Sequence, residues 1–268
     1  MNRPVGETKE RGSLRTSRGL SILIALLFAL AACSSDEPSE DAGNDPAEPS
    51  SITVFAAASL TDAFGEIGDV FMEDNKNLEA EFNFLASSDL ATQIIEGAPA
   101  DVFASADETN MDDVVAEELA TDPLVFVENR LSIAVQQGNP KSIATLEDLE
   151  NQDLVVVLCN EECPAGRYAL EIFDNAGVTV EADSLEADVR GVLTRVGLGE
   201  ADAGLVYLTD IEADPEVEGV EIPEDVNVIA TYPIAPIEGA PQAASDFVEF
   251  VLSEAGQQIL SEYGFQIP

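Results

Sequence analysis

The chain has 268 residues, 46% of them hydrophobic, which is enough for one large domain or two modest ones with a real core. Its 53 Asp and Glu against 11 Lys and Arg give a formal net charge of −42, and this balance excludes the clustered cations that nucleic-acid binding needs. Histidine is absent, which excludes Ser-His-Asp and Cys-His catalysis and leaves a poor ligand set for zinc.

The acidic residues are concentrated in the body of the chain. Residues 1–32 carry five basic and two acidic residues, so the chain from Cys33 onward holds six Lys and Arg against 51 Asp and Glu, a net charge of −45. Such a surface fits a soluble body in salty or extracellular surroundings, at the cost of self-repulsion. We therefore expect a salt-rich habitat.

The N-terminus has the pattern of an export signal over residues 1–32. Gly19 to Ala32 is an apolar stretch of 14 residues, shorter than the roughly 20 of a membrane span and typical of a signal peptide. It ends Leu30-Ala31-Ala32-Cys33, which resembles a bacterial lipobox and implies cleavage before Cys33 and lipidation of its thiol. The alternative is an ordinary signal peptide, or an uncleaved anchor, with an incidental cysteine.

An acidic tether is expected to follow, so that residues 33–51 comprise the lipidated Cys33 and a disordered spacer. Residues 34–51 contain no aromatic or branched aliphatic side chain and are dominated by Pro, Ser and acids, so they cannot bury apolar area. As a flexible coil, this segment averages roughly 25 Å end to end. That length lets a tethered domain reach a partner in the membrane.

From Ile52 onward, short apolar runs rich in β-branched residues alternate with segments of helical period. The expected strands cover residues 52–57, 81–85, 102–104, 131–135, 154–158, 203–207 and 227–232. Apolar residues at helical spacing predict helices over 60–73, 167–173 and 189–196, and again between 247 and 260. Strands alternating with helices imply parallel sheets flanked by helices, an α/β fold.

Four turns in this pattern lead from a strand into a helix and carry small or polar residues. They lie at Ser59, at Ser87 and Ser88, at residues 159–166 and at Asp188. A helix start exposes free N–H groups and the positive end of the helix dipole, and so suits an anion. In open α/β sheets, ligands bind beyond the carboxyl ends of the strands, where these turns lie. The simpler interpretation is that these residues are ordinary N-caps, each worth about 1 kcal/mol.

The two remaining cysteines, Cys159 and Cys163, lie in the third of these turns. Export makes oxidation the expected state, and two thiols without histidine form a poor metal site. We therefore predict a disulfide that stiffens the loop before Ala165, with a pair of free thiols as the alternative.

Six segments resemble the periplasmic molybdate-binding proteins of ABC transporters. They are ITVFAAASLTDAF (52–64), ASSDLATQIIEGAPADVFASAD (86–107), PAGRYA (164–169), ADVRGVL (187–193), AGLVYLTD (203–210) and EYGFQI (262–267). The resemblance implies a type II periplasmic-binding-protein fold, in which two α/β lobes joined by two crossing strands enclose a tetrahedral oxyanion. It places the crossings near 130–136 and 227–233, lobe 1 at 52–132 plus 231–268, and lobe 2 at 133–230.

The resemblance also implies which residues donate hydrogen bonds to the oxyanion: Ser59, Ser87, Ala165, Val189 and Tyr207. The serines act through hydroxyl and amide, the tyrosine through its phenol, and the other two through backbone N–H groups. The family usually has a longer serine run where this chain has Ala86-Ser87-Ser88-Asp89, which leaves Ser88 as an alternative to Ser87.

None of the five implied donors is cationic. A fully deprotonated dianion offers only acceptors, so N–H and O–H donors satisfy it without a counter-charge, at about 1.5–3 kcal/mol per hydrogen bond. We expect tight binding of molybdate and tungstate, which are similar in size. Sulfate is smaller than molybdate and should bind weakly. Phosphate should also bind weakly, because at neutral pH it carries a proton that needs a hydrogen-bond acceptor. Arg190, the nearest base in sequence, is expected to form a salt bridge at its helix start.

The function implied by the resemblance is capture of molybdate, and of tungstate, outside the cytoplasm and delivery to an ABC permease and its ATPase. The oxyanion is then the transported ligand and no cofactor is expected. We expect a monomer, lipid-anchored to the outer face of the cytoplasmic membrane or in the periplasm. The alternatives are a receptor for another tetrahedral oxyanion such as sulfate or phosphate, or a non-binding structural surface lipoprotein. An enzyme with Ser59 as nucleophile is disfavoured, because no histidine and no nearby lysine would activate it.

Overall fold

The structure, a computed structural model, describes residues 50–268; the predicted signal segment, Cys33 and residues 34–49 of the tether lie outside this range. One mixed sheet runs through the described residues. Its strands are β1 (Ser50–Ala57), β2 (Leu78–Leu85), β3 (Val102–Ala104), β4 (Leu124–Gln136), β5 (Val156–Cys159), β6 (Ser184–Glu186), β7 (Ala203–Tyr207), β8 (Val217–Val220) and β9 (Ile229–Pro236).

Helices connect most of these strands. The α-helices are α1 (Thr61–Asp74), α2 (Ser87–Ile95), α3 (Glu108–Ala116), α4 (Pro164–Ala176), α5 (Val189–Gly197), α6 (Leu208–Ala213), α7 (Gln242–Leu252) and α8 (Glu254–Glu262). Two short 3₁₀ helices, η1 (Ala58–Leu60) and η2 (Glu147–Glu150), complete the set. Within residues 50–268, no helix combines the length and the apolar character that crossing a membrane requires.

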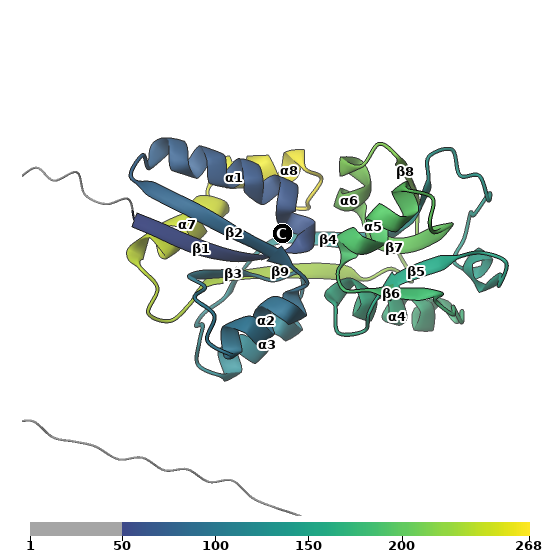
Figure 1. The fold of residues 1–268 in the computed structure, drawn as a ribbon, viewed down its shortest axis with the longest axis horizontal. Coiled ribbons are helices and arrows are strands. Elements are labelled where there is room, and N and C mark those ends of the chain that lie inside the picture. The colour runs from purple at the N-terminus through teal and green to yellow at the C-terminus, as the bar shows by residue number, and fades with distance from the viewer. Residues whose placement is uncertain (1–49) are drawn as a thin grey trace, which may run out of the picture. The chain divides into compact units, whose positions relative to one another are not determined.

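The long strand β4 divides the sheet into two parts. Its first part pairs antiparallel with β9, from Leu124 opposite Ile234 to Arg130 opposite Ile229, and residues 131–135 then pair with β7. The sheet order is β2-β1-β3-β9-β4-β7-β5-β6, with β8 beside β4. The chain thus forms two α/β lobes: the first holds β1 to β3, the second holds β5 to β8, and β4 and β9 run between them (Figure 1).

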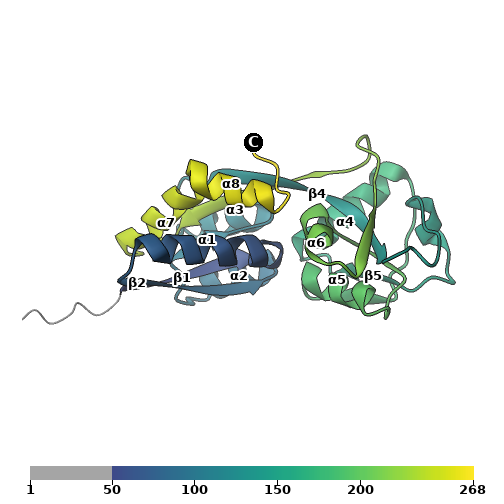
Figure 2. The ribbon, with the colours of Figure 1, turned by 90° about the horizontal axis from the view of Figure 1, so that it is seen from above.

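Helices cover both faces of the sheet in each lobe. In the first lobe α1, α7 and α8 lie on one face and α2 and α3 on the other, and in the second lobe α5 and α6 lie opposite α4 (Figures 1 and 2). In α1, Phe64, Ile67 and Phe71 recur every three or four residues, so they form one buried stripe. Phe64 packs edge-on against Phe247 of α7, with ring centroids 6.0 Å apart. Burying such a side chain stabilises the fold by about 1.5–3 kcal/mol.

The α/β architecture with two crossing strands is confirmed, but the expectation of parallel sheets is only partly correct. Strands β1, β2 and β3 are mutually parallel, as are β5, β6 and β7. In contrast, β4 and β9 are antiparallel to their neighbours. The reason is that β4 carries the chain into the second lobe and β9 carries it back, so the two run in opposite directions.

Several element bounds differ from those expected. Strand β1 begins at Ser50, so Ser50 and Ser51, expected in the tether, belong to the sheet, and the Ser50 N–H donates to the Asn77 carbonyl at 2.9 Å. Strands β6 and β8 were not predicted, because short segments of partly exposed, charged residues carry little periodic signal. The residue bounds predicted for the two lobes remain a prediction, to which the pairing of β4 lends support.

Candidate anion-binding site

Strand ends from both lobes meet at one small pocket. The five donors expected from the sequence all line it: Ser59, Ser87, Ala165, Val189 and Tyr207. The other lining residues are mostly small: Ala57, Ala58, Ala86, Ala106, Cys163, Pro164 and Asp188. Ser88 does not line the pocket, so the geometry favours Ser87 of the two neighbouring serines.

The pocket is narrow and its walls are buried. The cavity volume open to the centre of a water molecule is about 10 Å³, enough for roughly one water. A tetrahedral anion with four oxygens therefore needs a small outward shift of the walls. No Lys or Arg lines the pocket, so N–H and O–H dipoles are the groups there that can face an anion.

Two of the helices that start at the pocket lack a side-chain cap. Helix α2 begins at Ser87 after Ala86, and α4 begins at Pro164 after Cys163, and neither cap residue makes a side-chain hydrogen bond. Pro164 has no N–H to satisfy, which leaves the amide of Ala165 as the first free donor of α4. The ordinary N-cap interpretation is therefore wrong for Ser87, which is the first helical residue rather than the cap.

The start of α5 has both an ordinary N-cap and a free amide that could bind an anion. Asp188 is a true N-cap, and its side chain accepts a hydrogen bond from the Gly191 N–H at 2.9 Å. That bond satisfies the third amide of the helix and leaves the first, on Val189, without an intrahelical partner. The Val189 amide is buried at the pocket wall, where an anion can accept from it.

Three hydroxyl groups belong to the same pocket. Ser87 Oγ accepts a hydrogen bond from the Ala106 N–H at 2.9 Å, and Ser59 Oγ lies 3.0 Å from the hydroxyl of Tyr232. The Tyr207 hydroxyl is buried and has no hydrogen-bond partner within the described part of the chain. Burial raises the pKa of Tyr207 well above its ordinary value, so the phenol keeps its proton. The hydroxyls of Ser87 and Tyr207 therefore have a hydrogen to offer a ligand.

Arg190 is the cation next to the pocket, and it is held by carboxylates in both lobes. It pairs with Asp62, at the start of α1, and its Nε lies 3.1 Å from Oδ1 of Asp210 in the second lobe. The expected salt bridge at the start of α5 is thus present. Burial raises the pKa of Asp210 to about 6, although the charge of Arg190 opposes the rise.

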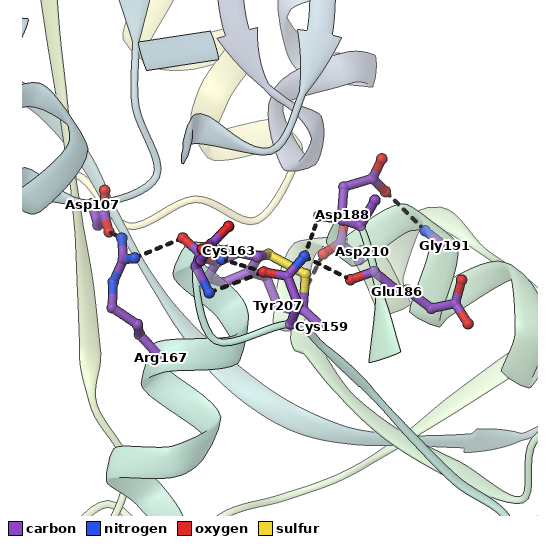
Figure 3. The surroundings of a disulfide bond; sticks show 12 residues. Asp107, Cys159, Cys163, Arg167, Glu186, Asp188, Gly191, Tyr207 and Asp210 are labelled. Carbon is purple, nitrogen blue, oxygen red and sulfur yellow. Dashed lines mark hydrogen bonds and ion pairs between the residues drawn. A yellow bond between two sulfur atoms is a disulfide. The ribbon is translucent and has the colours of Figure 1, made fainter. Parts of the chain in front are cut away.

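A second ion pair also links the two lobes. Arg167, one turn into α4, pairs with Asp107, the N-cap of α3 in the first lobe (Figure 3). Asp107 is almost fully buried and also accepts from the Asn110 N–H at 3.1 Å. Two ion pairs therefore join residues of one lobe to residues of the other, and Asp107 and Arg190 directly follow the pocket residues Ala106 and Val189.

Cys159 and Cys163 form a disulfide, with their Cα atoms 6.1 Å apart (Figure 3). It closes the loop between β5 and α4, and Cys163 is both the cap of α4 and a wall of the pocket. The loop positions the Ala165 amide, because the Cys163 N–H donates to the Asn160 carbonyl at 3.1 Å.

A much larger hollow in the second lobe does not have the chemistry for an anion. This hollow, of about 420 Å³, is bordered by Glu150, Glu181 and Asp183, whose carboxylates repel negative charge. No group of three or more Cys, Asp or Glu within residues 50–268 is arranged to hold a metal ion. The small pocket is thus the better candidate site.

Sequence reasoning missed the residues that support the site from behind. Tyr232 contacts Ser59 from the crossing strand β9, and Arg167 and Asp107 join the lobes. Tyr232 is 173 positions from Ser59 and Arg167 is 60 positions from Asp107, so no local spacing signals either contact. For Tyr232, the available signal was a hydroxyl-bearing aromatic at an inward position of a predicted strand.

The fold and pocket define a class: a two-lobed α/β protein whose lobes meet at a small pocket lined by backbone amides and hydroxyl groups. A family model for bacterial extracellular solute-binding proteins matches residues 52–266. The chain belongs to this family, and it is a binding protein rather than an enzyme.

Known relatives agree with this membership. The chain is 41% identical over 257 residues to the molybdate-binding protein ModA of Mycobacterium tuberculosis, covering 93% of this chain and 98% of the relative. Among solved structures, it resembles the periplasmic molybdate-binding protein of Azotobacter vinelandii, with a TM-score of 0.72 and 15% identity over 81% of this chain and 99% of the other. The sulfate-binding protein SubI of Mycobacterium tuberculosis also gives 0.72, at 17% identity, over 81% and 87%. At such identities the two structures establish the fold alone, and they bear out the predicted type II periplasmic-binding-protein fold.

Proposed function

We propose that this protein binds molybdate, and also tungstate, outside the cytoplasm and delivers it to an ABC importer. The observation that carries the proposal is the single pocket that gathers amides of two helix starts and three hydroxyl groups with no lining cation. The relatives named as molybdate-binding proteins support the choice of anion. Molybdate is the transported ligand and not a cofactor.

The donors suit a fully deprotonated tetrahedral dianion. Ser59 and Ser87 of the first lobe, with Ala165, Val189 and Tyr207 of the second, surround it from both sides. Hydrogen bonds to a charged group contribute about 1.5–3 kcal/mol each, so six or more leave micromolar or better affinity after the cost of association. The protein's negative net charge does not oppose this, because its field is screened within about 8 Å at physiological ionic strength.

Sulfate and phosphate receptors are the competing functions within the same class. The likeness to a sulfate-binding protein reflects the fold and does not select the anion. Sulfate is smaller than molybdate and leaves some donors unfilled, whereas phosphate at neutral pH carries a proton that needs an acceptor. A lipoprotein without any ligand is the remaining alternative, and it predicts no stabilisation by any oxyanion.

Calorimetry with the purified full-length chain tests the proposal. Molybdate and tungstate should bind with similar, micromolar or tighter affinity, and sulfate and phosphate at least about a hundredfold more weakly, a gap of roughly 3 kcal/mol. Equal affinity for sulfate would overturn the size argument, and the absence of any oxyanion binding would overturn the function.

A pair of matched variants locates the site. Tyr207→Phe removes a buried hydroxyl that has no partner within residues 50–268, so molybdate binding should weaken roughly tenfold while the ligand-free fold is not destabilised. Tyr263→Phe removes an exposed hydroxyl bonded to Glu66 at 2.9 Å, away from the pocket, and should leave affinity unchanged. Equal effects of the two variants would refute the assignment of the pocket.

The proposal includes a lipid anchor and a monomeric protein. Residues 1–32 direct export, Cys33 is acylated, and the acidic residues up to 49 leave the two-lobed body free to reach the permease. Membership of an extracellular solute-binding family supports the location. Cys33→Ser should move the protein from the membrane fraction to the soluble fraction, and retention in the membrane would contradict acylation at this cysteine.

A further inference from the structure

We propose that Tyr232, which lies behind the pocket, is a positioning residue that fixes Ser59 as a hydrogen-bond donor and so excludes oxyanions that still carry a proton. The inference rests on the proposed function and deepens it. It names a residue through which the pocket distinguishes oxyanions by their protonation state rather than by their size.

Tyr232 is held rigidly in the crossing strand β9. It is fully buried, and it is not among the residues that line the pocket. Its ring packs edge-on against Tyr207 and Phe265, with centroids 5.7 Å away in each case, and against Phe126 at 6.3 Å. Its hydroxyl meets Ser59 Oγ at 3.0 Å. A fixed ring leaves the hydroxyl little freedom other than rotation about its own C–O bond.

The direction of this hydrogen bond decides what Ser59 offers to a ligand. Each hydroxyl has one hydrogen and two lone pairs. If Ser59 donated to Tyr232, its lone pairs would face the pocket and repel an anion. If Tyr232 donates, the hydrogen of Ser59 is free to point at a ligand oxygen. The 3.0 Å contact allows either hydroxyl to donate. In our proposal the hydrogen of this bond belongs to Tyr232, whose phenol stays protonated because burial raises its pKa well above its ordinary value.

Ser87 makes a comparable hydrogen bond, but its partner is a backbone amide, so the direction of that bond is fixed. Its Oγ accepts from the backbone N–H of Ala106 at 2.9 Å, and an amide N–H only donates. With Tyr232 as the donor to Ser59, both pocket serines have an acceptor lone pair engaged by a donor from the protein interior. Both then turn their hydrogens toward the pocket.

A proton on the ligand meets few acceptors in such a pocket. Hydrogen phosphate presents one O–H that needs an acceptor, and one of the two lone pairs on each serine oxygen is already engaged by a donor from the protein interior. Asp188 is the carboxylate among the lining residues, and its Oδ1 accepts from the Gly191 amide. A site that leaves a polar hydrogen unpaired loses most of the affinity that its other hydrogen bonds provide.

Sulfate and hydrogen phosphate at pH 7.5 form the probe pair, since both are dianions of similar size and only one carries a proton. Each is titrated as a competitor against bound molybdate, using the full-length chain. The wild-type protein should prefer sulfate over hydrogen phosphate by tenfold or more. Equal affinity for the two would overturn the inference even with molybdate binding intact, and this measurement needs no variant.

Tyr232→Phe keeps the ring and removes only the donor. Molybdate affinity should fall roughly tenfold, whereas hydrogen phosphate should bind as well as before or better, because Ser59 recovers a lone pair. The preference for sulfate over hydrogen phosphate should shrink by a similar factor. A merely structural role would weaken all the anions equally and leave that ratio unchanged, which would overturn the inference.

A double-mutant cycle tests whether Tyr232 acts through Ser59. In a Ser59→Ala background, Tyr232→Phe should cause no further loss of molybdate affinity, and additive losses would contradict the mechanism. Tyr263→Phe is the matched control, since it removes an exposed phenol hydroxyl bonded to Glu66. If the wild-type protein binds no molybdate at all, the proposed function fails first and this inference falls with it.

Discussion

Asp210 shows how a single buried carboxylate arranges its surroundings without touching the ligand. It is fully buried at the start of α6, and its Oδ2 accepts from the Tyr207 N–H at 3.2 Å. Its Oδ1 lies 3.1 Å from Nε of Arg190. The same carboxyl therefore fixes the end of β7, which carries the pocket tyrosine, and holds the nearest cation away from the pocket. Burial raises its pKa to about 6, so this arrangement depends on pH.

Asp210→Asn should change how stability depends on pH. Because the pKa is near 6 in the folded protein and about 3.8 in the unfolded chain, the folded state binds the proton more tightly. The wild-type protein therefore loses stability from this residue as the pH rises from about 4 to about 6, and asparagine has no charge to bury. The stability of the variant relative to wild type should rise by on the order of 2 kcal/mol between pH 4 and pH 7.

Urea unfolding of both proteins at several pH values measures this difference. Subtracting the free energy of unfolding of the wild type from that of the variant at each pH cancels the effect of the self-repulsion of the acidic surface. This repulsion is nearly the same in the two proteins. Parallel pH profiles would contradict a raised pKa for Asp210.

At the scale of an element, the start of α4 is the part of the site with the least room. Gly166 lies so close to the preceding loop that an added Cβ would be 1.9 Å from the carbonyl oxygen of Asn160. The disulfide between Cys159 and Cys163 closes that loop, so the loop cannot simply move aside. This close contact sets the position of the Ala165 amide, the first free donor of the helix.

Gly166→Ala should therefore displace the start of α4. We expect a loss of about 1–3 kcal/mol of stability from overpacking, and a loss of molybdate affinity of tenfold or more. The control is Gly65→Ala in α1, where an added Cβ meets nothing within 4 Å. That control should gain up to about 1 kcal/mol of stability from helix propensity and bind normally. Thermal unfolding and calorimetry report both quantities, and normal binding by Gly166→Ala would contradict the role of this contact.

At the scale of the whole molecule, the dominant property is uncompensated negative charge. The described residues form seven ion pairs, between five cations and seven carboxylates. From Cys33 onward the chain holds 51 acidic residues, so most carboxylates have no cationic partner. Their mutual repulsion opposes the compact state, and added salt weakens that repulsion because the screening length falls from about 10 Å at 0.1 M to about 3 Å at 1 M.

The free energy of unfolding should rise with ionic strength. Urea unfolding in low salt and in molar KCl measures it, and we expect stabilisation of a few kcal/mol, well beyond what a protein of balanced charge shows. Sucrose at matched osmolality is the control for effects other than screening. A free energy of unfolding that does not respond to salt would contradict both the repulsion and the salt-rich habitat inferred from the composition.

Local patterns predicted much of the fold and of the site. The strands β1, β3 and β7 and the helices α1 and α5 were expected within about two residues, since each rests on apolar periodicity of its own segment. The positions of Ser59, Ser87 and Val189 at strand-to-helix turns are equally local. Resemblance to a known family then indicated which turns converge, and all five expected donors line one pocket.

By itself the sequence determined the α/β alternation, the acidic surface, the absence of histidine chemistry and the turns that carry free amides, because each of these depends on neighbouring residues or on counts. Only the tertiary structure decided that Tyr232 contacts Ser59, that Arg190 joins Asp62 to Asp210, and that Arg167 reaches Asp107. These contacts join residues that are far apart along the chain, or that lie in different lobes, so they exist only once the crossing strands have brought both lobes around one pocket.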